Sequence, residues 1–201
     1  MSNFTDFFPA ASGGGGGGIP KYEEFTSSGT FTPTQALIDA GGRGAYMIVG
    51  GGERGAGDAD EGYGGAGGQV KMGYMTLTST TGCAVTIGAG GSGSNGANGG
   101  ASSVAFNSAG GTAITANGGA ENHVTNTGGN FGANHRTDVH LGGMTAAHPG
   151  FVGGYGAGGA SGNYNAGQTG SGVETPVANS GQGSCWGINA ADGFVRITWF
   201  E

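Results

Sequence analysis

The chain has 201 residues, of which 52 are glycine, and it carries a formal net charge of −7 with only six lysine and arginine residues. So few basic residues exclude the electrostatic footprint of a nucleic-acid-binding protein and argue against binding to anionic membranes. No window approaches the run of about 18 apolar residues that a transmembrane helix needs, and the N-terminus MSNFTDFFPAAS lacks the regions of a secretory signal.

An aromatic segment followed by a glycine linker begins the chain. Phe4, Phe7 and Phe8 lie within the first eleven residues, which are too few to fold alone, and residues 13–18 are all glycine. Such a glycine run is typical of a flexible linker. We therefore expect residues 1–20 to be a peptide that docks on a partner, with a frayed terminus as the alternative, and residues 21–201 to be the folded domain.

The next segment predicts strands and one short helix. In residues 22–32, Phe25 and Phe31 flank a Ser-Ser-Gly turn signal, which indicates a strand or a short hairpin. Thr32 is then expected to cap a short helix that has Pro33 at its first position and ends at Gly41. The apolar run AYMIV at residues 45–49 is typical of a buried strand and is followed by three glycines.

The remaining strand signals are spread over the rest of the chain. Residues 70–78 alternate in polarity and are separated from the apolar run at 84–87 by a Thr-Gly turn, which predicts a hairpin. Residues 104–106 and 113–115 indicate two short strands, and residues 193–200 alternate as a final strand. The expected fold class is mainly β with one short helix.

Glycine doublets recur through the second half of the chain. The first five begin at Gly90, Gly99, Gly110, Gly118 and Gly128, so they are spaced by eight to eleven residues. A flexible linker needs no spacing, whereas extended chains can pack closely only where glycine removes the Cβ, as in collagen. Collagen itself is excluded because the Gly-X-Y repeat is absent. The doublets therefore predict a scaffold of packed, extended glycine-rich segments that carries loops.

The balance between hydrophobic burial and backbone entropy limits how this scaffold could be ordered. Between residues 118 and 192 large aliphatic and phenylalanine residues are sparse. At about 1.5–3 kcal/mol for each buried side chain, they cannot offset about 1–2 kcal/mol of backbone entropy for each ordered residue. Order in this region would therefore have to come from a dense network of backbone hydrogen bonds or from oligomerisation.

The order of these motifs resembles a known family. Its most specific parts are IVGGG at residues 48–52, TIGAGG at 86–91 and DGFVRI at 192–197, and the resemblance covers residues 25–201. The chain resembles the glycine-rich receptor-binding adhesins and tail-fibre tip proteins of tailed bacteriophages. The resemblance implies a glycine-rich β-sandwich with polyglycine, polyproline-II-like segments and long loops. The chain departs from the family in residues 118–170, where isolated doublets replace long glycine runs.

The resemblance also implies a function. The expected protein is a non-enzymatic adhesin of the virion, assembled in the host cytoplasm, that binds a bacterial surface protein or glycan through loops, chiefly at residues 53–63 and 122–148. Its other partners would be virion proteins, contacted through Phe4, Phe7 and Phe8, and it would be a homotrimer or a single tip on a trimeric fibre. The alternative is a capsid spike, fibre or decoration protein without direct receptor binding. The candidate receptor-binding residues are Arg54, Asp58, Asp60, Tyr63, His123, Phe131, His135, Arg136, Asp138, His140 and Tyr164.

No cofactor, metal or catalytic site is predicted. The GxGxxG match at residues 88–93 is not followed by a helix pattern that could hold a phosphate. The acidic residues 58–62 resemble the start of a calcium loop but lack its closing ligands, and His135 and His140 do not have the spacing of a zinc pair. Cys83 and Cys185 are expected to be reduced, packed thiols rather than one disulfide.

Overall fold

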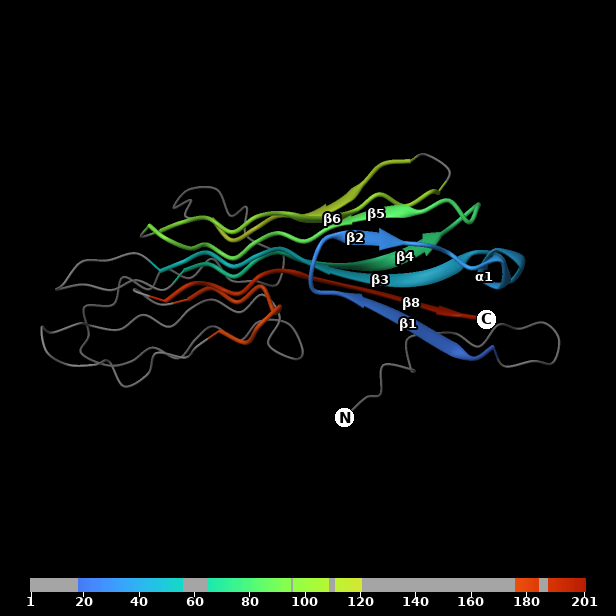
Figure 1. Ribbon diagram of the computed structural model, residues 1–201, viewed down its shortest axis with the longest axis horizontal. Helices are drawn as coiled ribbons and strands as arrows, with labels where there is room; N and C mark the ends of the chain where they lie inside the picture. The colour runs from blue at the N-terminus through green and yellow to red at the C-terminus, as the bar shows by residue number, and fades with distance from the viewer. Residues whose placement is uncertain (1–17, 56–64, 95, 109–110, 121–175, 185–187) are drawn as a thin grey trace, which may run out of the picture.

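The computed structural model describes residues 18–55, 65–94, 96–108, 111–120, 176–184 and 188–201. Within these residues the chain forms two four-stranded antiparallel sheets and one short helix, which confirms the mainly-β fold. The sheets occupy one end of the molecule. Glycine-rich segments without strand assignment continue from the strands and form the other end (Figure 1).

The two sheets are built from strands distant in the sequence. The first, sheet A, has the order β1-β8-β3-β4, and the second, sheet B, has the order β2-β5-β6-β7. The strands of sheet A are β1 (Pro20–Phe25), β8 (Phe194–Phe200), β3 (Arg43–Val49) and β4 (Val70–Thr76). The strands of sheet B are β2 (Gly29–Phe31), β5 (Cys83–Thr86), β6 (Ser102–Val104) and β7 (Ile114–Ala116).

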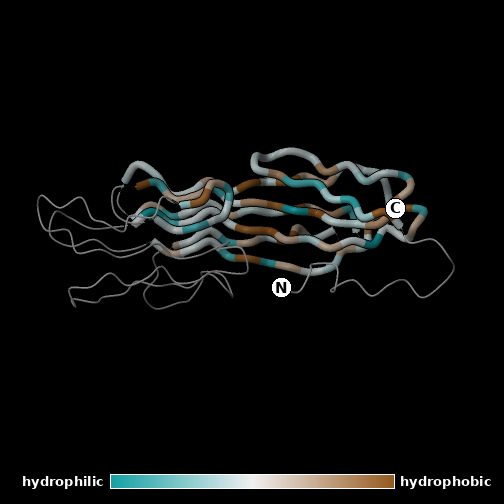
Figure 2. The backbone as a smooth tube through the Cα atoms, turned by 90° about the horizontal axis from the view of Figure 1, so that it is seen from below, coloured by the Kyte–Doolittle hydropathy of each residue, from teal (hydrophilic) through white to brown (hydrophobic). Residues whose placement is uncertain are grey.

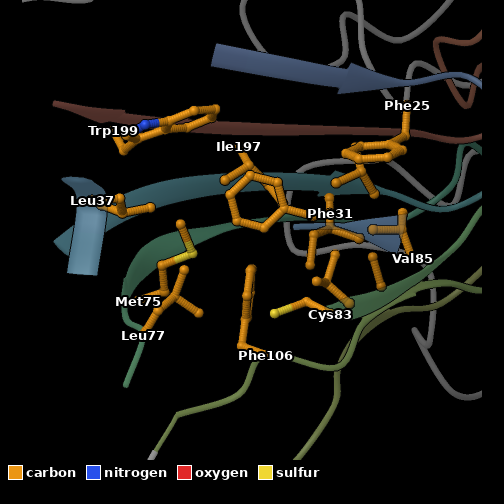
Figure 3. Close-up of a cluster of buried hydrophobic side chains, with 14 residues drawn as sticks. Phe25, Phe31, Leu37, Met75, Leu77, Cys83, Val85, Phe106, Ile197 and Trp199 are labelled. Atoms are coloured by element: carbon orange, nitrogen blue, oxygen red, sulfur yellow. The ribbon is translucent and has the colours of Figure 1, made fainter. Parts of the chain in front are cut away.

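The hydrophobic core fills the space between the sheets. Because side chains alternate along a strand, Val195, Ile197 and Trp199 of β8 all face the core. Sheet B contributes Phe31, whose ring lies 5.3 Å from that of Trp199 between centroids. Figure 3 shows these side chains with Phe25, Leu37, Met75, Leu77, Cys83, Val85 and Phe106 in one cluster. Figure 2 shows that most of the hydrophobic colour lies in the sheets.

The expected strand positions are correct to within a few residues, but two expected pairings are wrong. β1 and β2 do not form a hairpin, because β1 pairs with β8 in sheet A and β2 pairs with β5 in sheet B. β4 and β5 do not pair either, since β4 pairs with β3. The chain crosses between the sheets after β4, where the buried Leu77 donates its backbone N–H to the carbonyl of Gly42 over 2.8 Å.

The helix α1 (Gln35–Asp39) begins later than expected. Its N-cap is Thr34, not Thr32, because the Thr34 hydroxyl accepts a 3.1 Å hydrogen bond from the Leu37 N–H. The helix ends at Gly41 as expected, and this glycine adopts a φ of +98°. Its N–H bonds the carbonyl of Ile38, and the next N–H, of Gly42, bonds the carbonyl of Leu37, which is a Schellman motif.

Cys83 and Trp199 occupy the positions expected of them. Cys83 is a free thiol that is buried on β5, and this burial raises the pKa of its thiol. Trp199 is 7% exposed and belongs to the core. Cys185 and Trp186 lie outside the described residues.

A bundle of glycine-rich segments continues from the sheets, with residues 50–55 at its centre. The N–H groups of Gly50 and Glu53 donate to the segment 65–69, those of Gly51 and Arg54 donate to 97–100, and that of Gly52 donates to 190–192, all over 2.8–2.9 Å. The carbonyls of Gly51, Gly52 and Glu53 accept from three further segments, 117–119, 88–91 and 181–184. Among the described residues, six segments therefore surround one, and we call this arrangement the glycine bundle.

The hydrogen bonds identify the geometry of the central segment. Bonds to the same neighbour recur every third residue, at Gly50 and Glu53 and again at Gly51 and Arg54. A β-strand repeats every second residue and has neighbours on two sides only. Three residues per turn is the repeat of the polyproline II helix, which has no internal hydrogen bonds and so directs its N–H groups outward in three directions.

The outer six segments also bond to one another and close a ring. The order is 65–69, 181–184, 190–193, 88–91, 97–100 and 117–119. The last segment returns to the first through the 2.8 Å bond from the Gln69 N–H to the Asn117 carbonyl. The doublets Gly90-Gly91, Gly99-Gly100 and Gly118-Gly119 all lie in this ring, so in the described residues the glycine-rich segments are held together by backbone hydrogen bonds. Residues 121–175, which form most of the region with few large apolar residues, lie outside the described residues.

Glycine is required in the bundle because the chains lie too close for a side chain. A Cβ added at Gly51, Gly52 or Gly99 would lie 2.0–2.2 Å from a backbone carbonyl oxygen of the neighbouring segment. Real Cβ atoms do not approach backbone atoms this closely, so the neighbouring chain would have to move, and that chain is itself held by hydrogen bonds on its other sides.

Ile19 and the C-terminal residue Glu201 lie at the opposite end of the molecule from the bundle. Ile19 exchanges backbone hydrogen bonds with Glu201 over 2.7 and 3.2 Å, which continues the pairing of β1 with β8. The Thr34 hydroxyl donates to the Glu201 carboxylate and lowers the pKa of that carboxyl. Figure 1 shows the C-terminus beside α1, while β3 runs from this end toward the bundle.

We predict that Gly52→Ala destabilises the protein far more than Gly29→Ala does. The new Cβ at position 52 would lie 2.0 Å from the Gln182 carbonyl oxygen, whereas at position 29 it would make ordinary 3.6 Å contacts with the Phe25 ring. Overpacking that moves backbone should cost at least about 3 kcal/mol, against less than about 1 kcal/mol for the control. Chemical denaturation measures both, and similar losses would contradict the close-packed bundle.

Candidate functional site

Several connections leave the glycine bundle at the end farthest from the sheets. The segment 50–55 leads into residues 56–64, the segment 88–91 into residues 92–96, and the segment 181–184 into residues 185–187. The segment 117–119 runs from β7 in the same direction and leads, after Ala120, into residues 121–175. We call this region the loop end of the bundle, since it gathers the starts of all four connections.

Hydrogen bonds hold the bases of three connections together. The Arg54 N–H donates to the Ala97 carbonyl over 2.9 Å, and the Gly96 N–H donates to the Gly55 carbonyl over 3.4 Å. The Gly65 N–H donates to the Ser184 carbonyl over 2.7 Å. Residues far apart in the sequence thus meet at one end, and the bundle fixes the spacing between the loops that they begin.

Ser184 ties together the two ends of the connection at residues 185–187. Its side chain is fully buried, and its hydroxyl donates to the Ile188 carbonyl. The same hydroxyl oxygen accepts a 3.4 Å hydrogen bond from the Gly55 N–H. A buried hydroxyl that both donates and accepts is satisfied, so Ser184 has a structural role in joining the base of one loop to the base of another.

Glu53 is a buried carboxylate at the loop end, with 4% of its surface exposed. Its Oε2 accepts a 2.8 Å hydrogen bond from the Ala66 N–H, while its own N–H donates 2.8 Å to the Ala66 carbonyl. The receptor-binding loop expected over residues 53–63 is therefore wrong at its first residue. Glu53 stabilises the bundle, because without its side chain the Ala66 amide would lose this acceptor in a packed interior.

Arg54 lies next to Glu53, and it is the candidate receptor-binding residue that the structure describes. Its guanidinium Nη1 donates to the carbonyl of Gly93, so it spans the bases of the connections at 56–64 and 92–96. Its Nε atom is buried, and no hydrogen-bond partner for it is found among the described residues. A half-buried arginine held in this way presents a fixed positive charge at the loop end.

The other candidate residues lie outside the described residues. The structure describes the bases of the receptor-binding loops rather than their side chains: Gly55 and Gly65 bound the loop that carries three candidates, residues 121–175 carry seven, and the three phenylalanines belong to residues 1–17. Arg54 could be nominated from sequence as a basic residue close to the acidic residues 58–61, whereas Ser184 has no sequence signal that separates it from the chain's other serines. The undescribed candidates are Asp58, Asp60, Tyr63, His123, Phe131, His135, Arg136, Asp138, His140, Tyr164 and the N-terminal Phe4, Phe7 and Phe8.

The described part of the chain has neither a cluster of metal ligands nor a helix that could span a membrane. In that part, no three histidine, cysteine, aspartate or glutamate side chains gather in a way that could hold a metal ion. No helix there has the length and apolar character needed to cross a membrane. The glycines at residues 88–91 are packed within the bundle, and the turn that follows at residues 92–94 is not helical.

Comparisons with protein-family models, curated proteins and solved structures found no match to this chain.

We predict that Glu53→Ala lowers the free energy of unfolding by about 1–3 kcal/mol, which is the usual cost of an unsatisfied buried amide. Glu53→Gln keeps an acceptor for the Ala66 N–H and should lose less. Urea denaturation of the two variants measures the difference. A Glu53→Ala variant as stable as the parent would show that the side chain does not support the bundle.

Proposed function

We propose that this protein is a bacteriophage adhesin that binds a bacterial surface protein or glycan through the loops at the end of the glycine bundle. The observation that carries the proposal is the convergence of four connections on one hydrogen-bonded end, opposite the C-terminus. Rigid scaffolds that display clustered loops are typical of recognition proteins, because the scaffold positions the loops and leaves their sequences free to vary.

The composition of the loops supports recognition rather than catalysis. Tyr63, Phe131 and Tyr164 offer large contact areas at a low entropic cost, as aromatic residues do in antibody loops. Histidine, arginine and aspartate near residues 135–140 supply hydrogen bonds and charge. Together with Arg54 at the base, these side chains suit a polar surface such as a glycan or an outer-membrane protein loop.

We assign virion attachment to the end where Ile19 pairs with Glu201, which is the end away from the loop bases. Phe4, Phe7 and Phe8 precede Ile19 in the sequence and lie outside the described residues. Attachment at one end and recognition at the other is the arrangement that a tail-fibre tip requires, either as a homotrimer or as a single subunit on a trimeric fibre. In this proposal the protein works in the virion, with other virion proteins as partners.

We predict that replacing His135 and Arg136 by alanine weakens the binding of the fluorescently labelled full chain to host bacteria by at least about tenfold, which corresponds to about 1.4 kcal/mol. The thermal unfolding midpoint should not change, because neither residue belongs to the described bundle or sheets. Flow cytometry with the phage's host strain measures binding.

Arg43→Ala is the matched control, since Arg43 is an exposed arginine on sheet A at the other end of the molecule. It should bind like the parent. Equal losses in both variants would indicate non-specific electrostatic adhesion and would contradict the loop-end proposal. If the parent bound no bacteria but bound empty capsids, the protein would instead be a capsid spike or decoration subunit.

A further inference from the structure

The outer face of sheet A has the composition of an interface. Residues paired across a sheet share one face, and the pairs Tyr22 with Thr198, Thr198 with Ala45, and Ala45 with Tyr74 therefore form one row across all four strands. The next row is Glu24, Arg196, Met47 and Met72. In the usual two-sheet sandwich the outward faces are polar, but this face carries aromatic and methionine side chains.

A described segment covers one half of this face. Toward the bundle, Met47, Val49, Val70 and Phe194 form a second buried cluster on the outer side of the sheet. Gly181 packs so tightly against Val49 that an added Cβ would lie 2.6 Å from its Cγ1. The segment at residues 176–184 therefore passes over the bundle half of the face.

The half of the face nearer Ile19 and the C-terminus carries three large side chains with high exposed fractions. Tyr22 is 68% exposed, Tyr74 is 67% exposed and Met72 is 44% exposed. The two tyrosines lie on the edge strands β1 and β4, and the small residues Thr198 and Ala45 lie between them. We call this half, defined by Tyr22, Tyr74 and Met72, the tyrosine face.

Arg196, which is held by an ion pair with Glu24, borders the tyrosine face. Arg196 donates a 2.7 Å hydrogen bond from Nε to Glu24, and its guanidinium lies 5.8 Å from the Tyr22 ring centroid and 5.7 Å from that of Phe194. Its positive charge is therefore paired with the Glu24 carboxylate, and its guanidinium lies near the rings of Tyr22 and Phe194. Such a face suits an apolar aromatic partner better than a highly charged one.

The N-terminal segment of the same chain is within reach of the tyrosine face. Gly18 lies against Phe200, since a Cβ built on it would be 3.1 Å from the Phe200 Cβ. Gly18 is the tenth residue after Phe8, and all six residues from 13 to 18 are glycine. A glycine-rich chain of that length has a root-mean-square span of about 17 Å. With strands about 4.8 Å apart and a rise of about 3.3 Å per residue, Met72 is about 16 Å from Phe200.

We propose that the aromatic segment at residues 4–9 docks on the tyrosine face of its own chain, placing its phenylalanine rings against Tyr22, Tyr74 and Met72. The chemistry is complementary, because aromatic rings pack well on tyrosine edges and on a methionine thioether. Asp6, the acidic residue of the segment, suits a face that also carries the exposed Arg43. Docking is a property of the free chain, and attachment to a fibre would exchange this contact for one with the fibre.

The affinity needed for docking is small. A short flexible linker holds its two ends at an effective concentration in the millimolar range. A contact with a dissociation constant of about a millimolar is therefore enough to keep the face covered in a large fraction of molecules, and three phenylalanine side chains offer sufficient apolar area for a contact of that strength.

Oxidation of methionine tests the docking on the full chain. Dilute hydrogen peroxide converts exposed methionine to its sulfoxide, and mass spectrometry with peptide fragmentation separates Met72 from Met75, which is 6% exposed in the sandwich core and reports on folding. In the variant Phe4→Ser, Phe7→Ser, Phe8→Ser the rate at Met72 should rise about threefold with no change at Met75, because a contact occupied two-thirds of the time leaves one-third of molecules open.

The matched control changes the same segment but keeps its phenylalanines. The variant Asn3→Ser, Thr5→Ser, Ala10→Ser should oxidise like the parent. An unchanged Met72 rate in the phenylalanine variant would overturn the proposal. Protection that weakens when the parent is diluted would also overturn it, because it would mean that a second copy covers the face.

If Met75 also oxidises faster, the triple variant has lost its fold. The single variant Phe7→Ser then replaces it, and the oxidation rate of Met72 divided by that of Met75 should be higher than in the parent. None of these rates depends on bacterial binding. Failure of the docking proposal and failure of the adhesin proposal are therefore separate outcomes.

Discussion

The absence of Cβ atoms at the centre of the bundle is the constraint on which the rest of the molecule depends. A side chain at Gly50, Gly51 or Gly52 would lie 2.0–2.2 Å from a neighbouring carbonyl oxygen, and each of these glycines faces a different segment. A polyproline II helix has three faces. A segment surrounded on all three therefore needs glycine at three successive positions, which is why an uninterrupted Gly-Gly-Gly run follows β3.

The outer segments explain the doublets. A segment in the ring packs against the central segment and against a ring segment on either side, and its outer side faces solvent, so one residue in three is free to carry a side chain. Ala89, Asn98 and Asn117 are such residues, and each is exposed beside glycines that pack against the central segment or the next ring segment. The same geometry thus produces a run of three glycines at the centre and doublets around it. Different interactions stabilise the two parts of the molecule. Buried side chains stabilise the hydrophobic sandwich, and backbone hydrogen bonds stabilise the bundle.

Local features of this fold could be predicted from the sequence, and long-range partners could not. The alternation of Phe194 to Phe200 and the apolar run before Gly50 identify β8 and β3, because periodicity is local. The partner of β4 is not encoded locally. Its turn toward β5 resembles a hairpin, but Leu77 is buried and bonds to Gly42, so the chain changes sheets there. At the loop end, Arg54 was predictable as a charged residue beside glycines, whereas the burial of Glu53 depends on an amide from residue 66 that only the folded bundle brings near.

The two kinds of order have different consequences for recognition. In a hydrophobic core, a change in one side chain is felt by its neighbours, because the packing is tight and specific. Most contacts in the bundle are between backbones, and the side chains of Glu53 and Ser184 add hydrogen bonds at the loop end, so its stability depends on these positions and hardly on what the connecting loops contain. Loops that start from Gly55, Gly91 and Ser184 can therefore differ in length and sequence while their bases stay fixed. This physical separation of scaffold from loops is the reason for proposing recognition as the function.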